Sequence, residues 1–222
     1  MKSILLTKSI DNIHKGLIEQ KHPNIKIDIV PFIKTIGVPF SEPLWYPYVV
    51  FTSQNAFKYL LSNEDCLGIL KSRGCIAVGD KTLQLLKKSH VNVIAPSKQN
   101  SEGIIELINQ HTDIRGITYF CGKRRHPLLE SYLKSKHIRY EAIEVYDTID
   151  CEVEIDVINY DIVLFASPSA VDSFFSQYDN IDCDCYAIGP TTAAALYKFT
   201  DRVKVANEPS IESMIDLIIE NY

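Results

Sequence analysis

The chain has 222 residues, of which 46% are hydrophobic and 23% charged, a composition typical of a globular protein with one large domain or two small ones. Its formal net charge is −5, and its one dense basic run is Lys123-Arg124-Arg125, which argues against a duplex nucleic-acid partner. No stretch approaches the about 20 consecutive apolar residues of a membrane helix, and the apolar run near the N-terminus is too short for a signal-peptide core, so we expect a cytoplasmic protein with no membrane partner.

Short β-branched runs alternate with amphipathic stretches of about ten residues, a pattern that predicts βα units in an α/β fold with largely parallel sheets. The predicted strands are Ser3–Thr7, Ile25–Val30, Tyr48–Thr52, Cys75–Val78, Val91–Ile94, Ile117–Cys121, Tyr140–Val145, Ile162–Ala166, Cys185–Ile188 and Val203–Val205. The predicted helices are Asp11–Gln20, Gln54–Leu61, Asp80–Lys88, Ser101–Gln110, Pro127–Lys136, Pro168–Ser176, Pro190–Lys198 and Ile211–Glu220.

Two segments interrupt this alternation. Lys34–Pro47 contains Pro39, Pro43 and Pro47, and Asp147–Asp156 is polar and acidic. Because each follows the second strand of its half and has the composition of a connecting segment, we expect loops or crossings between domains there.

The two halves of the chain repeat each other. Ala77–Thr82 (AVGDKT) precedes Ala187–Thr192 (AIGPTT) by 110 positions, and Glu102–Ile108 matches Glu212–Ile218 at the same offset. Further upstream, FTSQNA beginning at Phe51 matches FASPSA beginning at Phe165 at an offset of 114. A register kept over about thirty residues indicates an internal duplication, which predicts two similar lobes.

The cysteines are scattered without the spacing of a disulfide framework. They are Cys66, Cys75, Cys121, Cys151, Cys183 and Cys185. Cys183-x-Cys185 lacks the spacing and the second pair of a zinc site. We therefore expect reduced thiols in a cytosolic protein and no metal site.

Each repeated motif predicts a strand, a tight turn and a helix N-terminus. Ser53 and Ser167 stand at N-cap positions, and Gly79 and Gly189 precede the next helix of each half. Such termini offer backbone N–H groups and the positive end of the helix dipole to an anion, and in parallel sheets they gather at the carboxyl edge. We expect the active site in a cleft lined by these termini. The alternative is capping alone, which stabilises a helix by about 1 kcal/mol without any ligand.

Cations follow the first strand of each half, with Lys8 in one and Lys123 in the other. Alone they are typical of solvated surface; beside the same cleft they would pair with carboxylates or phosphates. The sequence has no GxGxxG after the first strand and none of the phosphate-loop, nucleophile-elbow or zinc-protease motifs. Catalysis would then depend on binding, orientation and one acid.

The ordered set of motifs resembles the uroporphyrinogen-III synthase family, the cyclases of haem biosynthesis. The matching segments are VVFTSQNAF (Val49–Phe57), IAVGDKTLQLL (Ile76–Leu86), GKRRHPLLESYL (Gly122–Leu133), IEVYDT (Ile143–Thr148), VLFASPSAV (Val163–Val171), AIGPTTAAAL (Ala187–Leu196) and NEPSIESMIDLI (Asn207–Ile218). They follow the family order over nearly the whole chain. Lys8 departs from the pattern, which more often has arginine there.

The resemblance implies two similar lobes, each with a parallel five-stranded, flavodoxin-like or Rossmann-like sheet flanked by helices. Residues 1–35 and 148–222 would form one discontinuous lobe, and residues 36–147 would form the other, including linker segments. The two interrupting segments would then be a two-segment linker between the lobes.

The resemblance also implies a lyase that closes linear hydroxymethylbilane into uroporphyrinogen III, with loss of water and inversion of the terminal ring, and without a cofactor. It points to Tyr146 as the residue that assists departure of the hydroxyl, although the residues alone suggest that Tyr146 packs at a strand end. The expected substrate contacts are Lys8, Ser53, Asn55, Gly79, Thr82, Lys123, Ser167, Ser169, Gly189, Thr191 and Thr192.

Two alternatives remain open from the sequence. One is a non-catalytic, two-lobed module that closes on a small anion, which has no need of the VYDT segment. The other is a nucleotide-dependent transferase, disfavoured by the missing phosphate loop. We expect a monomer that binds a small polycarboxylate and no nucleic acid.

Overall fold

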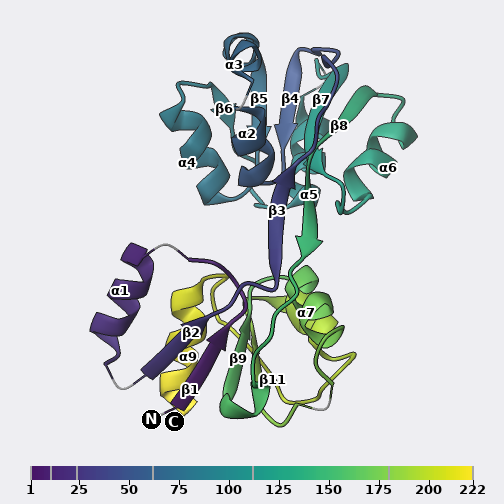
Figure 1. Ribbon diagram of the computed structural model, residues 1–222. Helices are drawn as coiled ribbons and strands as arrows, with labels where there is room; N and C mark the ends of the chain where they lie inside the picture. Colours follow the sequence, from purple (N-terminus) through teal and green to yellow (C-terminus); the bar gives the residue numbers. More distant parts are fainter. Residues whose placement is uncertain are drawn as a thin grey trace. The chain divides into compact units, whose positions relative to one another are not determined.

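The computed structural model describes residues 2–10, 12–23, 25–61, 63–111, 113–179 and 181–221 (Figure 1). The chain forms two compact units. Unit one comprises Met1–Lys34 and Ile149–Tyr222, and unit two comprises Thr35–Thr148. The chain therefore passes from unit one to unit two once and returns once.

Unit one has a single sheet with the strand order β11-β10-β9-β1-β2, and the strands pair in parallel. Its elements are β1 (Lys2–Leu6), α1 (Asn12–Lys21), β2 (Ile25–Ile29), the 3₁₀ turn η1 (Val157–Asn159), β9 (Ile162–Phe165), α7 (Pro168–Phe175), β10 (Asp184–Ala187), α8 (Pro190–Leu196), β11 (Val203–Val205) and α9 (Ile211–Asn221). Asp11, the predicted start of α1, lies outside the described residues.

Helices cover both faces of this sheet, which explains why its central strands are continuous apolar runs. Leu5 and Val163 point to the face packed by Phe174 of α7. Their neighbours Ile4 and Leu164 point to the other face, beside Met214 of α9 and other buried residues. Successive strand residues alternate between faces, so every position in these runs is buried.

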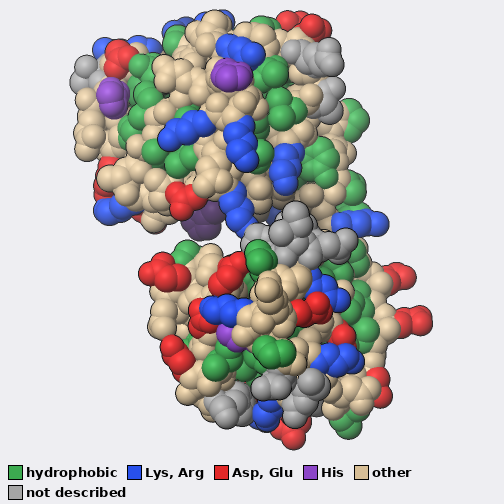
Figure 2. Space-filling model, turned by 90° about the vertical axis from the view of Figure 1, so that its left-hand side faces the viewer, with side chains coloured by type: hydrophobic (Ala, Val, Ile, Leu, Met, Phe, Trp, Pro, Cys, Tyr) green, Lys and Arg blue, Asp and Glu red, His purple; other side chains and the backbone are tan. Residues whose placement is uncertain are grey.

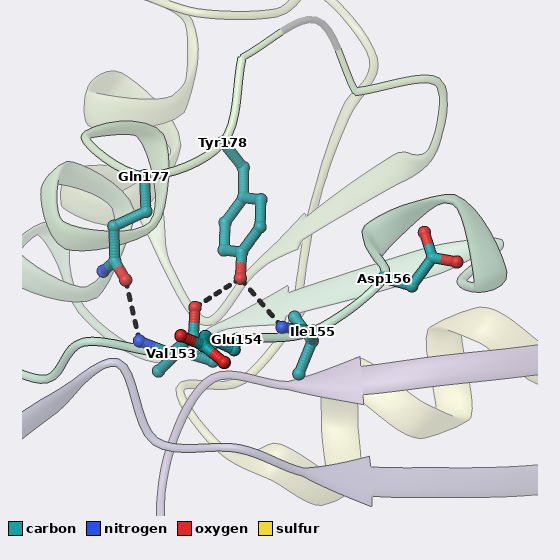
Figure 3. A pocket seen from close by; sticks show the side chains of 6 residues that line it. All are labelled: Val153, Glu154, Ile155, Asp156, Gln177 and Tyr178. Carbon is teal, nitrogen blue, oxygen red and sulfur yellow. Dashed lines mark hydrogen bonds between the residues drawn. The ribbon is translucent and has the colours of Figure 1, made fainter.

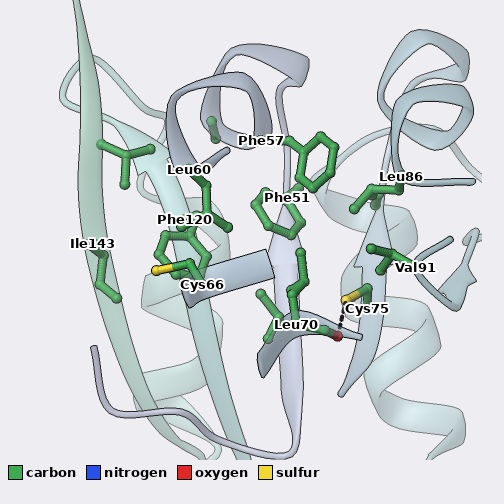
Figure 4. Packing of buried hydrophobic residues seen from close by; sticks show 14 of the residues in the cluster. Phe51, Phe57, Leu60, Cys66, Leu70, Cys75, Leu86, Val91, Phe120 and Ile143 are labelled. Atoms are coloured by element: carbon green, nitrogen blue, oxygen red, sulfur yellow. Dashed lines mark hydrogen bonds between the residues drawn. The ribbon is translucent and has the colours of Figure 1, made fainter. Parts of the chain in front are cut away.

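Unit two has a six-stranded sheet with the order β3-β8-β7-β4-β5-β6. Its elements are β3 (Ile33–Gly37), β4 (Tyr48–Phe51), α2 (Gln54–Leu60), α3 (Glu64–Leu70), β5 (Gly74–Ala77), α4 (Asp80–Lys88), β6 (Val93–Ile94), α5 (Ser101–Gln110), β7 (Gly116–Gly122), α6 (Leu128–Ser135) and β8 (Arg139–Asp150). On one face Phe51 stacks on Phe120, with ring centroids 5.5 Å apart, and both rings belong to a fully buried cluster with Phe57 (Figure 4).

The prediction of five strands was wrong for unit two, because the first interrupting segment begins as strand β3. Val38 N–H donates to Val145 O over 3.0 Å, and Cys151 N–H donates to Phe32 O over 2.8 Å, so the chain runs antiparallel to β8 here. The prolines that suggested a loop lie beyond β3, and β8 continues through Asp150 in the segment expected to be irregular. A polar edge strand lacks the buried apolar run that identifies central strands.

The internal duplication is visible in the fold. The βα unit β4–α2 corresponds to β9–α7, and β5–α4–β6–α5 corresponds to β10–α8–β11–α9, with the same strand neighbours in both sheets. Helix α3 has no counterpart among the described residues of unit one, and the sequence did not predict it because seven residues with Gly68 inside show too little helical periodicity.

Candidate functional site

The predicted site residues follow the carboxyl ends of parallel strands in both units. Lys8 follows β1, and Ser167 and Gly189 follow β9 and β10 in unit one. In unit two, Ser53 follows β4 and Lys123 follows β7. Strand order reverses between β1 and β9 in the first sheet and between β4 and β7 in the second. Ligands of open α/β sheets bind outside the carboxyl ends at such reversal points, so each unit presents a candidate site there.

The two predicted serine caps are confirmed. Ser53 Oγ accepts a hydrogen bond from Asn55 N–H over 3.1 Å at the start of α2. Ser167 Oγ accepts one from Ala170 N–H over 3.2 Å at the start of α7, where Pro168 occupies the first turn. Both hydroxyl groups thus have a structural role. Contact of Asn55, Ser169 or either serine with substrate stays a prediction.

The two glycine turns differ from one another. Gly79 has φ +84°, a left-handed conformation that favours glycine. Its N–H donates to Gln99 Oε1 over 2.7 Å, while Gln99 Nε2 donates to Pro96 O over 2.9 Å. Gly189 is extended, at φ −179°. In the repeat register Pro209 corresponds to Gln99. The side chain of proline has no amide group, so it cannot form the bond that Gln99 makes.

The threonines one turn into these helices are buried. Thr82 is 4% exposed and Thr192 is 1% exposed, and their N–H groups donate to Gly79 O and Gly189 O. Thr191, beside Thr192, is exposed. A substrate contact by these three side chains stays a prediction, and in this structure Thr191 is the accessible one.

The basic trio divides between structure and surface. Arg125 binds Glu130 through Nε at 2.8 Å and Glu144 through Nη1 at 2.7 Å, and these bonds raise the pKa of its guanidinium. Lys123 is exposed, with Nζ 3.4 Å from Asp147 Oδ2. Lys8 in unit one is likewise exposed. The pair is partly exposed and its charges are 3.4 Å apart, so it contributes little to stability and Lys123 is available to a stronger anion.

Tyr146 lies half-buried on β8, opposite Gly122 of β7. Burial raises the pKa of its phenol above the usual 10.0, and a hydrogen bond with Ser53 offsets part of that rise. The phenol is therefore protonated at neutral pH and able to donate a hydrogen bond. Because Lys123 N–H also donates to Tyr146 O over 3.0 Å, the structure brings Ser53, Lys123 and Tyr146 together in unit two.

Three further residues shape this region, and the sequence did not single them out. Gln99 binds the Gly79 amide, while Tyr59 and Gly122 lie against the ring of Tyr146. Gly122 opens the matching segment GKRRH, and a glycine in an otherwise apolar strand is a signal of close approach by another group. Tyr59 and Gln99 carry no comparable signal.

Charge is distributed unevenly between the units. Unit two carries 14 Lys and Arg against 11 Asp and Glu, a net of +3, whereas unit one carries 9 against 17, a net of −8. Figure 2 shows several Lys and Arg side chains on the face of unit two that carries α4. The overall acidity of the chain therefore comes from unit one, and an anion meets a more favourable field at unit two.

A hollow of about 620 Å³ in unit one is lined by Val153, Glu154, Ile155, Asp156, Gln177 and Tyr178 (Figure 3). Two of these residues, Gln177 and Tyr178, use their side chains to bind the backbone of the segment opposite. Val153 N–H donates to Gln177 Oε1 over 2.9 Å, and Ile155 N–H donates to the Tyr178 hydroxyl over 3.0 Å. The hollow contains no predicted site residue.

The six cysteines are free thiols, and all except the half-buried Cys151 are buried. Across the described ranges, no three His, Cys, Asp or Glu side chains gather as metal ligands would. None of the helices in the part of the chain that the structure describes is long and apolar enough to cross a membrane.

The fold and these turns define an α/β protein of two duplicated units, each with candidate anion-binding groups at the carboxyl edge of its sheet. The model of the family described as uroporphyrinogen-III synthase HemD matches residues 25–216. The chain belongs to this family.

Individual relatives agree with this assignment. The porphyrin biosynthesis protein HemD of Ruminiclostridium josui is 24% identical over 218 residues, which cover 86% of this chain and 42% of that protein. The chain thus spans less than half the length of this curated relative. Uroporphyrinogen-III synthetase from Helicobacter pylori has a similar structure, with a TM-score of 0.76, 19% identity and full coverage of both chains. A mutant uroporphyrinogen III synthase from Thermus thermophilus has a TM-score of 0.67 at 17% identity, over 99% of this chain and 98% of that one.

Proposed function

We propose that the chain is a uroporphyrinogen-III synthase, which closes linear hydroxymethylbilane into uroporphyrinogen III with loss of water and inversion of the terminal ring. The observation that carries this proposal is the family match over residues 25–216. The place of Tyr146, opposite Gly122 at the end of β7 and beside Ser53, is compatible with it.

The substrate carries eight carboxylates, and the candidate site of each unit offers groups suited to them. The capped helix N-termini after β4 and β9 present backbone N–H groups, and Lys123 and Lys8 are exposed cations. The positive net charge of unit two offsets the unfavourable field of an acidic protein. Recognition of carboxylates by backbone donors and a few cations is the mode of binding that we assign to this chain.

In the proposed reaction Tyr146 donates a hydrogen bond or proton to the departing hydroxyl of the substrate. A phenol suits this role because it is protonated at neutral pH and can donate a hydrogen bond, and burial raises the pKa of Tyr146 further. We assign it an assisting role, with substrate binding and orientation supplying the remainder of the rate enhancement.

The isomer formed from freshly generated hydroxymethylbilane tests the proposal. We expect the purified chain to yield the type III isomer without added metal or nucleotide. Formation of only the type I isomer, which arises without an enzyme, would contradict the proposal and favour a binding module. Heat-denatured protein serves as the control for spontaneous closure.

We further propose that units one and two are the two lobes implied by the family resemblance, with the crossings after Lys34 and after Thr148 as the two-segment linker. We also propose a monomer in the cytoplasm, a location supported by the free thiols of all six cysteines. Light scattering after size-exclusion chromatography tests the monomer, since a dimer would show twice the mass of 25.2 kDa.

A further inference from the structure

Two stacked tyrosine rings in unit two each lie close to a glycine. The rings of Tyr59 and Tyr146 stack with centroids 6.0 Å apart and planes inclined by 17°. Gly37 of β3 lies against Cδ1 and Cε1 of the Tyr59 ring, and Gly122 of β7 lies against the hydroxyl end of Tyr146. The four residues come from α2, β8 and the two strands that flank β8 in the sheet.

The ring of Tyr59 is held in place by β3. Its hydroxyl donates to Thr35 O over 2.6 Å, and Thr35 Oγ1 lies 3.2 Å away. A Cβ on Gly37 would stand 3.0 Å from Cδ1 of the same ring, so the ring is already in close contact with the strand. Tyr59 is thereby a fixed surface against which Tyr146 stacks.

Gly122 leaves room for the phenol of Tyr146 and for no additional atom. A Cβ there would stand 2.6 Å from Cζ, 2.8 Å from Cε2 and 2.9 Å from Oη of Tyr146. These atoms are the far end of a side chain that rotates, so an added methyl group would displace the hydroxyl and leave the backbone in place. The contact with Gly122 therefore involves the hydroxyl end of Tyr146, which is the end that takes part in the proposed reaction.

We propose that Tyr59 and Gly122 are positioning residues, which together fix the Tyr146 hydroxyl at the place where it meets the leaving group. This inference rests on the proposed catalytic role of Tyr146. A ring confined between an aromatic face and a glycine keeps one orientation, and a displacement of about 1 Å at a reacting group lowers the rate by up to about 100-fold.

Kinetic measurements on Gly122→Ala and Tyr59→Leu test the proposal. We expect each to lower kcat for type III formation by about tenfold or more, with KM changed less than about twofold, because orientation and not substrate affinity is lost. Tyr59→Phe keeps the stacked ring and loses the hydroxyl that bonds to Thr35, so it should retain most of kcat.

Matched controls separate positioning from loss of stability. Gly74→Ala places a Cβ 2.8 Å from the ring of Tyr48, the same kind of contact elsewhere in unit two. Tyr178→Leu removes a ring that packs at 5.4 Å on Phe174 and a hydroxyl bonded to Val153 O in unit one. Both controls should keep kcat within about twofold of the parent. An equal loss of kcat in the controls would overturn the proposal.

A double-mutant cycle tests whether the two residues act through the phenol. In the Tyr146→Phe background, Gly122→Ala and Tyr59→Leu should lower kcat by less than about twofold, because the hydroxyl they orient is absent. If Gly122→Ala and Tyr59→Leu lower kcat by the same factor in the Tyr146→Phe background as in the parent, the proposal is overturned.

A spectroscopic measurement keeps this inference distinct from the proposed function. In full-length protein labelled with ¹³C-tyrosine, the ring signal of Tyr146 is assigned by its loss in Tyr146→Phe. We expect it to shift in Tyr59→Leu and Gly122→Ala and to stay in place in Gly74→Ala. An unmoved signal overturns the positioning role even in an active enzyme, whereas a parent protein that forms no type III isomer overturns the proposed function. If Gly122→Ala fails to fold, Tyr59→Leu decides alone.

Discussion

The backbone amide of Gly79 donates to the side-chain oxygen of Gln99, over an N···O distance of 2.7 Å. The donor that precedes α4 therefore already has a partner within the chain, whereas the position that corresponds to Gln99 in unit one is Pro209, whose side chain has no oxygen to accept such a bond. If a substrate carboxylate binds at α4, it must displace Gln99.

Replacing Gln99 should consequently change substrate affinity and leave the chemical step alone. We expect Gln99→Ala to lower KM by about three- to tenfold, because a neutral hydrogen bond contributes about 1 kcal/mol net, with kcat unchanged. Gln99→Glu should raise KM, since its carboxylate repels that of the substrate. Gln177→Ala, which removes a comparable backbone bond in unit one, serves as the control. Unchanged KM in both Gln99 variants would show that α4 does not bind substrate.

Tyr146→Phe should slow turnover without unfolding the protein. The ring and its stacking on Tyr59 remain, so we expect a melting temperature within about 2 °C of the parent. Loss of the donor should lower kcat by about 10- to 100-fold, at or below the low end of general acid catalysis, because Tyr146 has an assisting role. Full activity of Tyr146→Phe would remove the residue from the mechanism.

Arg125 should matter for stability more than for binding. Its guanidinium joins Glu130 at the start of α6 to Glu144 on β8, with 19% of the side chain exposed. Arg125→Met leaves two carboxylates without their partner, and we expect a loss of about 1 to 2 kcal/mol in urea unfolding, less than for a fully buried pair. Arg115→Met, an exposed residue, should change stability by less than about 0.5 kcal/mol. Equal stability of the two variants would contradict this assignment.

Alkaline pH should destabilise the fold through its buried thiols. Burial raises the pKa of Cys75 from 9.0 to about 12, and that of Cys121 also to about 12 (Figure 4 shows Cys75). Between pH 9 and 12 the unfolded thiol loses its proton while the folded one keeps it. Stability is thus fully present below about pH 9 and falls as pH rises, by up to about 1.4 kcal/mol per pH unit for each group.

The variant Cys75→Ala isolates one of these thiols. It should be less stable than the parent at pH 7, because it leaves a small cavity. The difference in unfolding free energy should narrow by pH 10.5, since the variant no longer has this thiol to ionise on unfolding. Urea unfolding at both pH values measures this, and a constant difference would show that Cys75 does not contribute to the alkaline loss.

The sequence alone determined the local features of this protein. The buried strands, the caps at Ser53 and Ser167 and the duplicated βα units depend on residues within a few positions of one another, which hydrophobic periodicity and capping preferences reveal. The sequence did not predict the antiparallel strand β3, because this edge strand lacks a buried apolar run. Three of its residues, Ile33, Thr35 and Ile36, are nevertheless good strand formers.

Only the tertiary structure decided which distant residues meet. Gln99 accepts a hydrogen bond from the amide of Gly79. Tyr59 stacks on the ring of Tyr146, which also lies against Gly122. Such contacts depend on the pairing of β3, β7 and β8 and on the packing of α2, which sequence neighbours do not encode. Thr82 is a further example. The sequence predicted its position one turn into the helix after Gly79, but its burial depends on the elements that pack around α4.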